Sequence, residues 1–387
     1  MKVTFYSNFL SHHQLPFCNE MYEKLGKDFK FVATEPIHEE RLELGYEDMS
    51  EKYPFSLNAY TNEESYDKAL QLGEDSEIVI IGSAPAIFTN KRLKQNKITF
   101  RYSERIFKRG RYRIISPRSF IPLVRDHTRY MNKNVYMLCA SAYTAADFKL
   151  VRAYKKKAFK WGYFPEVKQH DLKILMEKKK NIVPKILWVG RLLELKHPEQ
   201  AVKIAAMLKA SDYSFHMDII GSGEMENELK EMIKKYELTS HIEVLGNMKP
   251  EQVRIHMEKA NIYLFTSDFN EGWGAVLNEA MNSGCAVVAS HAIGSVPFLL
   301  EQNKNGLIYK NGDLNHLYKC VTSLLDNSYF AEKLGTEAYN TLYETWNARF
   351  ATTRLIALFE SLLDGVQLEY EQGPCSQSEI ISHKYIY

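Results

Sequence analysis

Two glutamates eight positions apart stand out in the stretch FNEGWGAVLNEAMNSGCAVVAS, residues 269–290. Glu271 and Glu279 lie among small and apolar residues, although a carboxylate without a partner is costly to bury. If a helix begins near Gly274, Glu271 precedes it and Glu279 lies about one and a half turns inside it. At about 1.5 Å per residue, the carboxylates would then be roughly 8–12 Å apart. That is about the distance from the ribose of a nucleotide to a sugar on its far phosphate.

A structural interpretation of the same two residues is equally available. An acid near the start of a helix stabilises the helix dipole, and a second helical glutamate can simply face solvent. For two glutamates at this spacing and nothing else, we favour the structural interpretation.

The stretch GRLLELK, residues 190–196, indicates a diphosphate site. Arg191 can form two parallel hydrogen bonds to phosphate oxygens, and Lys196 adds a point charge. Glycines before a helix allow backbone N–H groups to approach an anion, and a helix beginning near Gly274 or Ala275 would offer such donors. Taken alone, Arg191 and Lys196 are more often two solvated loop charges.

Short β-branched or aromatic runs predict the strands that position these residues. The runs are 3–7, 29–34, 77–83, 97–103 and 135–141, followed by 185–191, 214–223, 241–247, 261–267 and 285–290. Segments of helical periodicity separate them, which predicts a parallel sheet. Two such series predict two doubly wound α/β domains. Because ligands bind beyond the carboxyl ends of parallel strands, the polar residues after the second-series strands should meet at one edge.

The domain boundary is expected within residues 160–185, where prolines, a glycine and a lysine run precede a new strand. The predicted N-terminal domain covers residues 1–165 and is completed by a C-terminal segment of about 345–387. The predicted C-terminal domain covers residues 166–344. Residues 346–365 form one amphipathic helix by their periodicity. The last residues, from about 371, carry no pattern and are expected to form a tail.

The constellation of these residues resembles the retaining glycosyltransferases of family 4, which have the GT-B fold. The resemblance rests on Gly-Arg-x4-Lys at residues 190–196, on EGWG at residues 271–274 and on NEAMNSGCAVVAS at residues 278–290. It covers about residues 185–313, where NGLIYKNGD is the family's usual ending, and extends in outline to the helix around Trp346. It implies two Rossmann-like domains that face each other across a cleft, with a C-terminal helix crossing back to the first domain.

The resemblance also implies roles for individual residues. Arg191 and Lys196 would hold the donor diphosphate and stabilise it as it leaves, Glu279 would accept hydrogen bonds from the ribose, and Glu271 would contact the donor sugar. The remaining donor-binding positions are Gly190, Gly221, Gly246, Asn247, Met248, Gly272, Trp273, Gly274 and Ala275. Fixed positive charge would take the place of a metal at the leaving group, so no metal ligand is predicted.

The first half departs from the family's pattern. No glycine occurs before Gly26, and the loop after the first strand contains His12 and His13 instead of a glycine-rich turn. Either histidine could contact a phosphate or assist the acceptor's deprotonation, or both could lie on the surface near a helix start. After the fourth strand, where relatives often have a histidine, Arg101, Ser103, Glu104 or Arg105 takes its place. Glu104 is either an acceptor-side group or an ion-pair partner. The acid usual in the Gly294–Phe298 region is also missing.

Charge is polarised along the chain, although the net charge is only +2. Residues 91–160 contain 20 Lys and Arg against 3 Asp and Glu, and residues 20–77 contain 6 against 16. Such a map predicts an anionic partner. An acceptor on a lipid diphosphate at an anionic membrane surface would suit it, whereas solvated helix faces are the structural alternative. The five cysteines are scattered and no run of about 18 apolar residues occurs, so we expect a cytoplasmic protein, peripheral to the membrane at most.

Together with these observations, the resemblance implies a retaining, metal-independent hexosyltransferase without a cofactor. The expected donor is a nucleotide-sugar, specifically a UDP-sugar, and the expected acceptor is a saccharide or a lipid-linked saccharide in cell-surface polysaccharide biosynthesis. A GT-B protein that binds a nucleotide-sugar without transferring it is the main alternative. A GT-B epimerase and a nucleic-acid-binding protein that uses the basic stretch are further alternatives, but no nucleic-acid-binding motif is present.

Overall fold

The fold was analysed in a computed structural model, which describes residues 1–39, 47–49, 52–108, 110 and 116–381. The chain divides into two compact units. The first unit contains Met1–Glu166 and Trp346–Ser382, and the second contains Val167–Thr345. Each unit holds one parallel sheet.

The sheet of the first unit has seven strands in the order β3-β2-β1-β4-β5-β6-β7, and all its pairs are parallel. The strands are β1 (Val3–Ser7), β2 (Phe29–Ala33), β3 (Ser56–Asn58), β4 (Ile78–Ile81), β5 (Thr99–Ser103), β6 (Val135–Cys139) and β7 (Ala158–Lys160). Strand β1 lies between β2 and β4, so the strand order reverses there. In such sheets the ligand site lies at the carboxyl ends of the strands that flank this reversal.

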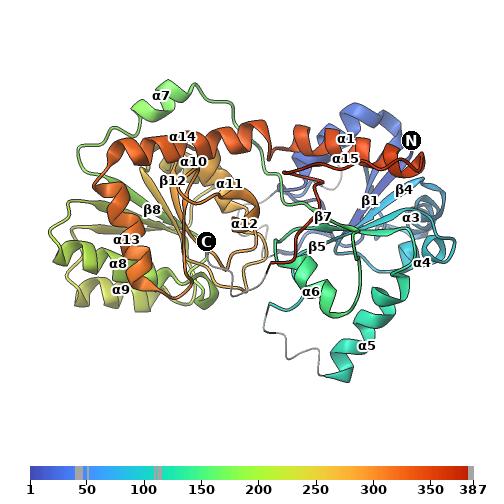
Figure 1. Ribbon diagram of the computed structural model, residues 1–387, viewed down its shortest axis with the longest axis horizontal. Coiled ribbons are helices and arrows are strands. Elements are labelled where there is room, and N and C mark those ends of the chain that lie inside the picture. Colours follow the sequence, from blue (N-terminus) through green and yellow to red (C-terminus); the bar gives the residue numbers. More distant parts are fainter. Residues whose placement is uncertain (40–46, 50–51, 109, 111–115, 382–387) are drawn as a thin grey trace. The chain divides into compact units, whose positions relative to one another are not determined.

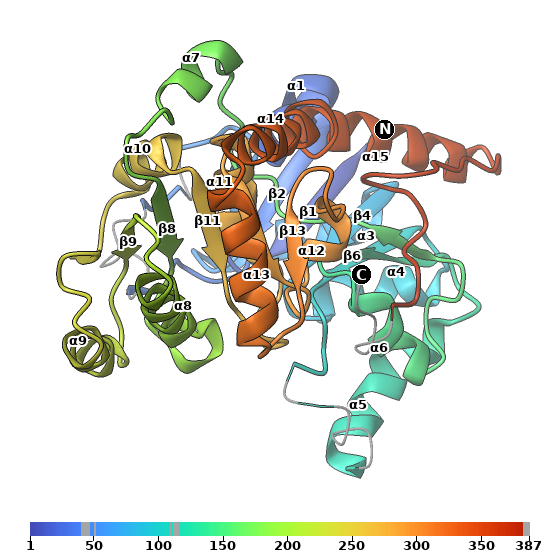
Figure 2. The ribbon, with the colours of Figure 1, turned by 60° about the vertical axis from the view of Figure 1, so that its left-hand side comes forward.

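Helices cover the sheet of the first unit, because strands such as β1 and β4 are buried along their whole length. The helices are α1 (Leu15–Leu25), α3 (Glu63–Asp75), α4 (Ile87–Lys94), α5 (Pro117–Asp126), α6 (Thr144–Leu150) and α15 (Ala348–Leu363). Helices α1 and α15 pack together, as do α3 and α4 (Figure 1). Helix α5 projects from the rest of its unit in both views (Figures 1 and 2).

The segment after α15 is not a tail, so that expectation was wrong. The N–H of Cys375 donates to the Lys160 carbonyl at 2.8 Å, and the N–H of Ser378 donates to the Ala158 carbonyl at 2.9 Å. Gln377 forms an antiparallel bridge with Phe159, so the segment extends the sheet beside β7 (Figure 1). Cys375 is fully buried. A strand edge leaves backbone donors and acceptors unpaired, and this segment satisfies those of β7.

The sheet of the second unit has six parallel strands in the order β10-β9-β8-β11-β12-β13. They are β8 (Lys185–Val189), β9 (His216–Ile220), β10 (Ile242–Gly246), β11 (Ile262–Phe265), β12 (Ala286–Ser290) and β13 (Leu307–Tyr309). Strand β8 pairs with β9 on one side and with β11 on the other, so the reversal of strand order lies between β8 and β11. The loops after these two strands therefore flank the expected ligand site.

The helices of the second unit form two packed groups. Helices α8 (Pro198–Ala210), α9 (Glu226–Lys235) and α13 (Leu314–Leu325) form one group (Figure 2). Helices α10 (Pro250–Lys259), α11 (Val276–Asn282) and α14 (Ser328–Glu344) form the other, and α7 (Leu172–Glu177) and α12 (Val296–Leu299) are short. The apolar core lies mainly between the sheet and the first group, where Leu208, Ile219 and Val321 are buried.

The predicted fold class, two doubly wound α/β domains, is confirmed, and each of the ten predicted runs contains a strand. The runs did not include β3, β7 and β13, since each of these strands has only three residues. No helix among the described residues is long and apolar enough to cross a bilayer.

Candidate functional site

The two loops beside the strand reversal of the second unit bring Lys196 and Glu271 together. Lys196 ends the 3₁₀ turn Glu194–Lys196 after β8, and Glu271 lies in the loop between β11 and α11. Their side chains form an ion pair, and each is less than one-fifth exposed. Ser267 donates a second hydrogen bond to Glu271, at 3.0 Å. The carboxylate that looked uncompensated in the sequence therefore has a cation 75 positions away.

Hydrogen bonds between the two loops fix this ion pair. The indole N–H of Trp188 donates to the Thr266 hydroxyl at 2.9 Å, and that hydroxyl donates to the Lys196 carbonyl at 2.7 Å. The N–H of Asp268 donates to the Leu195 carbonyl at 3.0 Å. Because Trp188 and Thr266 are fully buried, the backbone of Lys196 is anchored to the core while its amine remains partly accessible.

His197, which the sequence reasoning missed, also links the two loops. It has left-handed backbone angles, φ 50° and ψ 50°, and precedes α8. Its Nε2 lies 3.5 Å from Asp268 Oδ2 and its Nδ1 lies 3.1 Å from Glu199 Oε1. The hydrogen bonds with Asp268 and then with Glu199 raise the pKa of His197 to about 9. Burial alone would raise the pKa of Asp268, but its bonds with His197 and Asn270 lower it below its ordinary value.

Two of the predicted glycines occupy positions that exclude a side chain. Gly221 has φ +137°, and a Cβ there would lie 1.9 Å from the Gly190 carbonyl oxygen. Gly274 has φ +80°, and a Cβ there would lie 2.4 Å from the Phe265 ring. Backbone hydrogen bonds also join the ends of the neighbouring strands, from the Gly190 N–H to the Ile220 carbonyl and from the Gly221 N–H to the Gly246 carbonyl. The glycine turns therefore keep the carboxyl edge of the sheet compact.

Glu279 lies in the first turn of α11 and is half-buried. Within the described part of the chain, its carboxylate forms no hydrogen bond or ion pair. Burial raises the pKa of Glu279, and the positive charges of Arg254 and Lys168 partly oppose this effect. Arg254 is buried and hydrogen-bonded to Asn282, one turn further along α11. Glu279 is thus a partly desolvated acceptor that a hydroxyl-bearing ligand could satisfy.

The other predicted donor-binding residues fall into two groups. Trp273 is fully buried, and its N–H donates to Asn278 Oδ1 at 2.9 Å. Its side chain therefore lies in the core, and only its backbone is available for the predicted contact with a donor. Gly272 and Ala275 are buried as well, whereas Arg191 and Asn247 are exposed and Met248 is half-exposed. Among the described residues, Glu279 forms no hydrogen bond or ion pair with Lys196 or Glu271.

In the first unit, a cavity of about 530 Å³ lies at the carboxyl ends of β1, β4, β5 and β6. His12, His13 and Glu104 all line it. The rings of His12 and His13 are 3.6 Å apart, and His13 stacks on Tyr163 at 5.9 Å. The Tyr163 hydroxyl donates to Glu104 at 2.8 Å, and Lys108 forms an ion pair with the same carboxylate. Glu104 therefore forms an ion pair, which was one of the two interpretations of this residue. It also lines the cavity.

Two further polar residues line this cavity: His127, which was not singled out from the sequence, and Arg101, which was one of the residues expected in place of the family's histidine. Burial, followed by the charge of Arg101, lowers the pKa of His127 to about 3, so this histidine is neutral. The Nε of Arg101 is buried and has no partner. Arg105, by contrast, is buried against Asp147 at 3.5 Å. The cavity therefore offers the guanidinium group of Arg101 and three imidazoles to a polar ligand.

Comparison with known proteins shows a sequence similarity that is confined mainly to the second unit. Residues 172–341 match the family model described as Glycosyl transferases group 1. The amylovoran biosynthesis glycosyltransferase AmsK of Erwinia amylovora is 28% identical over 183 residues, which are 46% of this chain and 45% of that protein. The chain covers less than half the length of this and other curated relatives.

Two solved structures extend the likeness to both units. The lipopolysaccharide outer core galactosyltransferase WaaB has a TM-score of 0.68 at 15% identity over 93% of this chain and 100% of that chain. Anabaena Alr3699/HepE, solved in complex with UDP, has a TM-score of 0.66 at 15% identity with the same coverage. At this identity the likeness concerns the fold: the two parallel-sheet domains resemble those of GT-B glycosyltransferases.

Proposed function

We propose that this protein is a retaining glycosyltransferase that moves a sugar from a nucleotide-sugar to a saccharide or lipid-linked acceptor. The main observation that supports this proposal is the Lys196–Glu271 ion pair. It lies at the strand reversal of the second sheet, inside the segment that matches the Glycosyl transferases group 1 model. The UDP in the HepE structure and the biosynthetic role in the name of AmsK favour a UDP-sugar donor and polysaccharide assembly.

The proposed chemistry follows from the charges of this site. Lys196 would exchange part of its interaction with Glu271 for the donor diphosphate, and Arg191 would add a second cation. The ribose hydroxyls would satisfy Glu279, while Glu271 would accept a hydrogen bond from the donor sugar. Fixed cations stabilise a leaving diphosphate where its charge develops, so the mechanism needs no metal. The bond to the diphosphate would break ahead of attack, and the departing phosphate oxygen would help to take the acceptor's proton.

The first unit would bind the acceptor. Its cavity of about 530 Å³ is of the size that ordinary small-molecule sites have, and it is lined by imidazoles, Arg101 and Glu104. We further propose that the first unit contacts an anionic membrane through α5, where Arg118 and Arg125 are exposed beside Ile121, which is 62% exposed. Exposed cations and apolar side chains on one helix are typical of interfacial attachment.

The test is transfer or hydrolysis of UDP-, GDP- and ADP-sugars by the purified chain, with the anomeric configuration of the product read by NMR. Lys196→Ala should lower turnover at least about tenfold, or roughly 1.4 kcal/mol of transition-state stabilisation. Lys230→Ala is the matched control, because Lys230 forms an exposed ion pair on α9 outside the site. Equal turnover in the two variants would contradict the site assignment. Donor binding without turnover on any acceptor would indicate the non-transferring alternative.

A further inference from the structure

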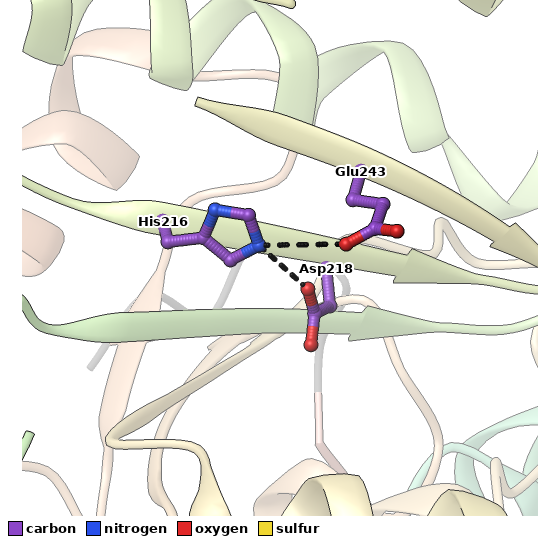
Figure 3. A group of neighbouring side chains, drawn as sticks. All are labelled: His216, Asp218 and Glu243. Atoms are coloured by element: carbon purple, nitrogen blue, oxygen red, sulfur yellow. Dashed lines mark hydrogen bonds and ion pairs between the residues drawn. The ribbon is translucent and has the colours of Figure 1, made fainter. Parts of the chain in front are cut away.

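A cluster of potential metal ligands lies on strands β9 and β10. His216 and Asp218 occupy alternate positions on β9, so their side chains share one face of the sheet. Glu243 on β10 pairs with Asp218 in the register. Figure 3 shows the imidazole of His216 directed at both carboxylates.

The distances within the cluster suit a single ion. His216 Nε2 lies 3.0 Å from Asp218 Oδ1 and 4.0 Å from Glu243 Oε2. One ligand atom from each residue lies within 4.8 Å of the others. Nitrogen and oxygen ligands lie at about 2.0–2.2 Å from Zn²⁺, which spaces such ligands about 3–4 Å from one another. The three side chains would need only small rotations to share an ion.

His256 supplies the outer support that metal sites commonly have. It comes from α10, and its Nδ1 lies 3.1 Å from Oδ2 of Asp218, the oxygen that does not face His216. A hydrogen bond to the second oxygen of a ligating carboxylate fixes the direction of the first. Asp218 is therefore held between two histidines that come from different elements.

The position of the cluster separates it from the proposed transfer site. His216 is the first residue of β9, while the turn at Gly221 follows the other end of that strand. The side chains of His216 and Glu243 are 35% and 62% exposed, so an ion could reach them from solvent. The two carboxylates could also balance the charge of one divalent cation.

We propose that His216, Asp218 and Glu243 bind one divalent transition-metal ion of the Zn²⁺ type, and that His256 positions Asp218. A mixed set of imidazole and carboxylate ligands favours Zn²⁺ or Co²⁺ over Mg²⁺, and over Mn²⁺ by the usual order of affinities. The ion would join β9 to β10 and would take no part in sugar transfer.

The competing interpretation is a metal-free network in which protonated histidines bridge the carboxylates. Lys185 lies close enough to oppose any added positive charge, because it pairs with His216 in the register and lines a small pocket together with Asp218, His256 and Lys259. Its ammonium group would repel a cation. Lys185→Met should therefore raise metal affinity if the cluster binds an ion.

The experiment is calorimetric titration of the EDTA-treated full chain with Zn²⁺, repeated with Co²⁺ and visible absorption as a spectroscopic readout. We expect one ion per chain, and loss of that binding in His216→Ala and Glu243→Gln. His256→Gln should weaken binding about 10–100-fold, as outer-sphere changes do. His241→Ala is the matched control, because His241 lies beside β10 but contacts Phe215 and Ser240 instead.

Two results would overturn the proposal. One is no Zn²⁺ binding by the wild-type chain at about 100 µM. The other is unchanged affinity and Co²⁺ absorption in Glu243→Gln, which alters an exposed side chain and should fold normally.

Discussion

Glu279 illustrates how a residue can lower stability and support binding. Burial raises its pKa, which means that the folded protein holds this proton more tightly than the unfolded chain does. Stability therefore falls as pH rises from the ordinary glutamate pKa through the raised one, and remains lower above it. A ligand that donates hydroxyl groups to the ionised carboxylate would recover that loss.

Glu279→Gln should consequently raise the melting temperature at pH 8 while weakening nucleotide-sugar binding at least about tenfold. The amide has no charge to desolvate, but it is a poorer acceptor for two hydroxyls. Thermal unfolding with and without a UDP-sugar measures both effects, with Glu228→Gln on α9 as control. A lower melting temperature without ligand would show that ionised Glu279 stabilises the fold.

The stability of the protein should also depend on pH through His197, whose pKa is raised by hydrogen bonds and not by burial. Its pKa in the folded protein is about 9, whereas an unperturbed histidine has a pKa of about 6.5. The stabilisation from its charged form is complete below about pH 6.5 and is lost as pH rises through about 9.

We expect His197→Asn to remove the part of the melting-temperature change between pH 6.5 and 9.5 that depends on this residue. Asparagine tolerates left-handed backbone angles, so the turn after Lys196 should persist. Thermal unfolding of both proteins at several pH values gives the comparison. Parallel curves across this range would mean that His197 is not charged in the folded state.

At the scale of elements, the segment after α15 stabilises the edge of the first sheet. The N–H of Ser378 donates to the Ala158 carbonyl at 2.9 Å. Ser378→Pro removes this donor and should lower the free energy of unfolding by about 1–3 kcal/mol. Ser378→Ala retains the N–H and serves as control. Denaturant unfolding of the two variants tests this role, and similar stabilities would show that the added strand contributes little.

Element lengths explain which parts of the fold the sequence could predict. Strands with four apolar residues in a row, such as β4 and β8, are recognisable in the sequence as apolar runs. Strands β3 and β7 have three residues each. They are extended because they pair with the neighbouring strands β2 and β6. The segment at Cys375 is the extreme case, since its hydrogen bonds go to residues more than 200 positions away.

At the scale of the whole molecule, charge is unevenly distributed between segments of the first unit. Helix α5 belongs to the stretch 91–160, which contains 20 basic residues and only 3 acidic ones. Each Arg near an anionic membrane contributes about 1 kcal/mol, or about fivefold in affinity. Arg125 is paired with Asp126 at 2.8 Å, so Arg118→Ala is the cleaner test and should weaken binding to vesicles containing phosphatidylglycerol by about fivefold.

Vesicle co-sedimentation at low and physiological salt measures this effect. Ile121→Glu should weaken binding as well, and Ile174→Glu on α7, where the isoleucine is 59% exposed, is the matched control. Equal loss in both isoleucine variants would contradict attachment through α5. Binding of nucleic acid that competes with vesicles would favour the nucleic-acid alternative.

The sequence by itself determined the alternation of strands and helices, and with it the sheet edge at which the loop residues meet. It did so because apolar runs, helical periodicity and glycine-containing turns can each be recognised within a short segment. Only the tertiary structure decided that Lys196 neutralises Glu271, that Tyr163 links His13 to Glu104 and that Trp273 lies in the core. The spacing of His216 and Asp218 in a strand indicates that their side chains lie on one face. Glu243 and His256 come close to them only through strand pairing and helix packing. Those contacts depend on register and packing between distant segments, which no local pattern specifies.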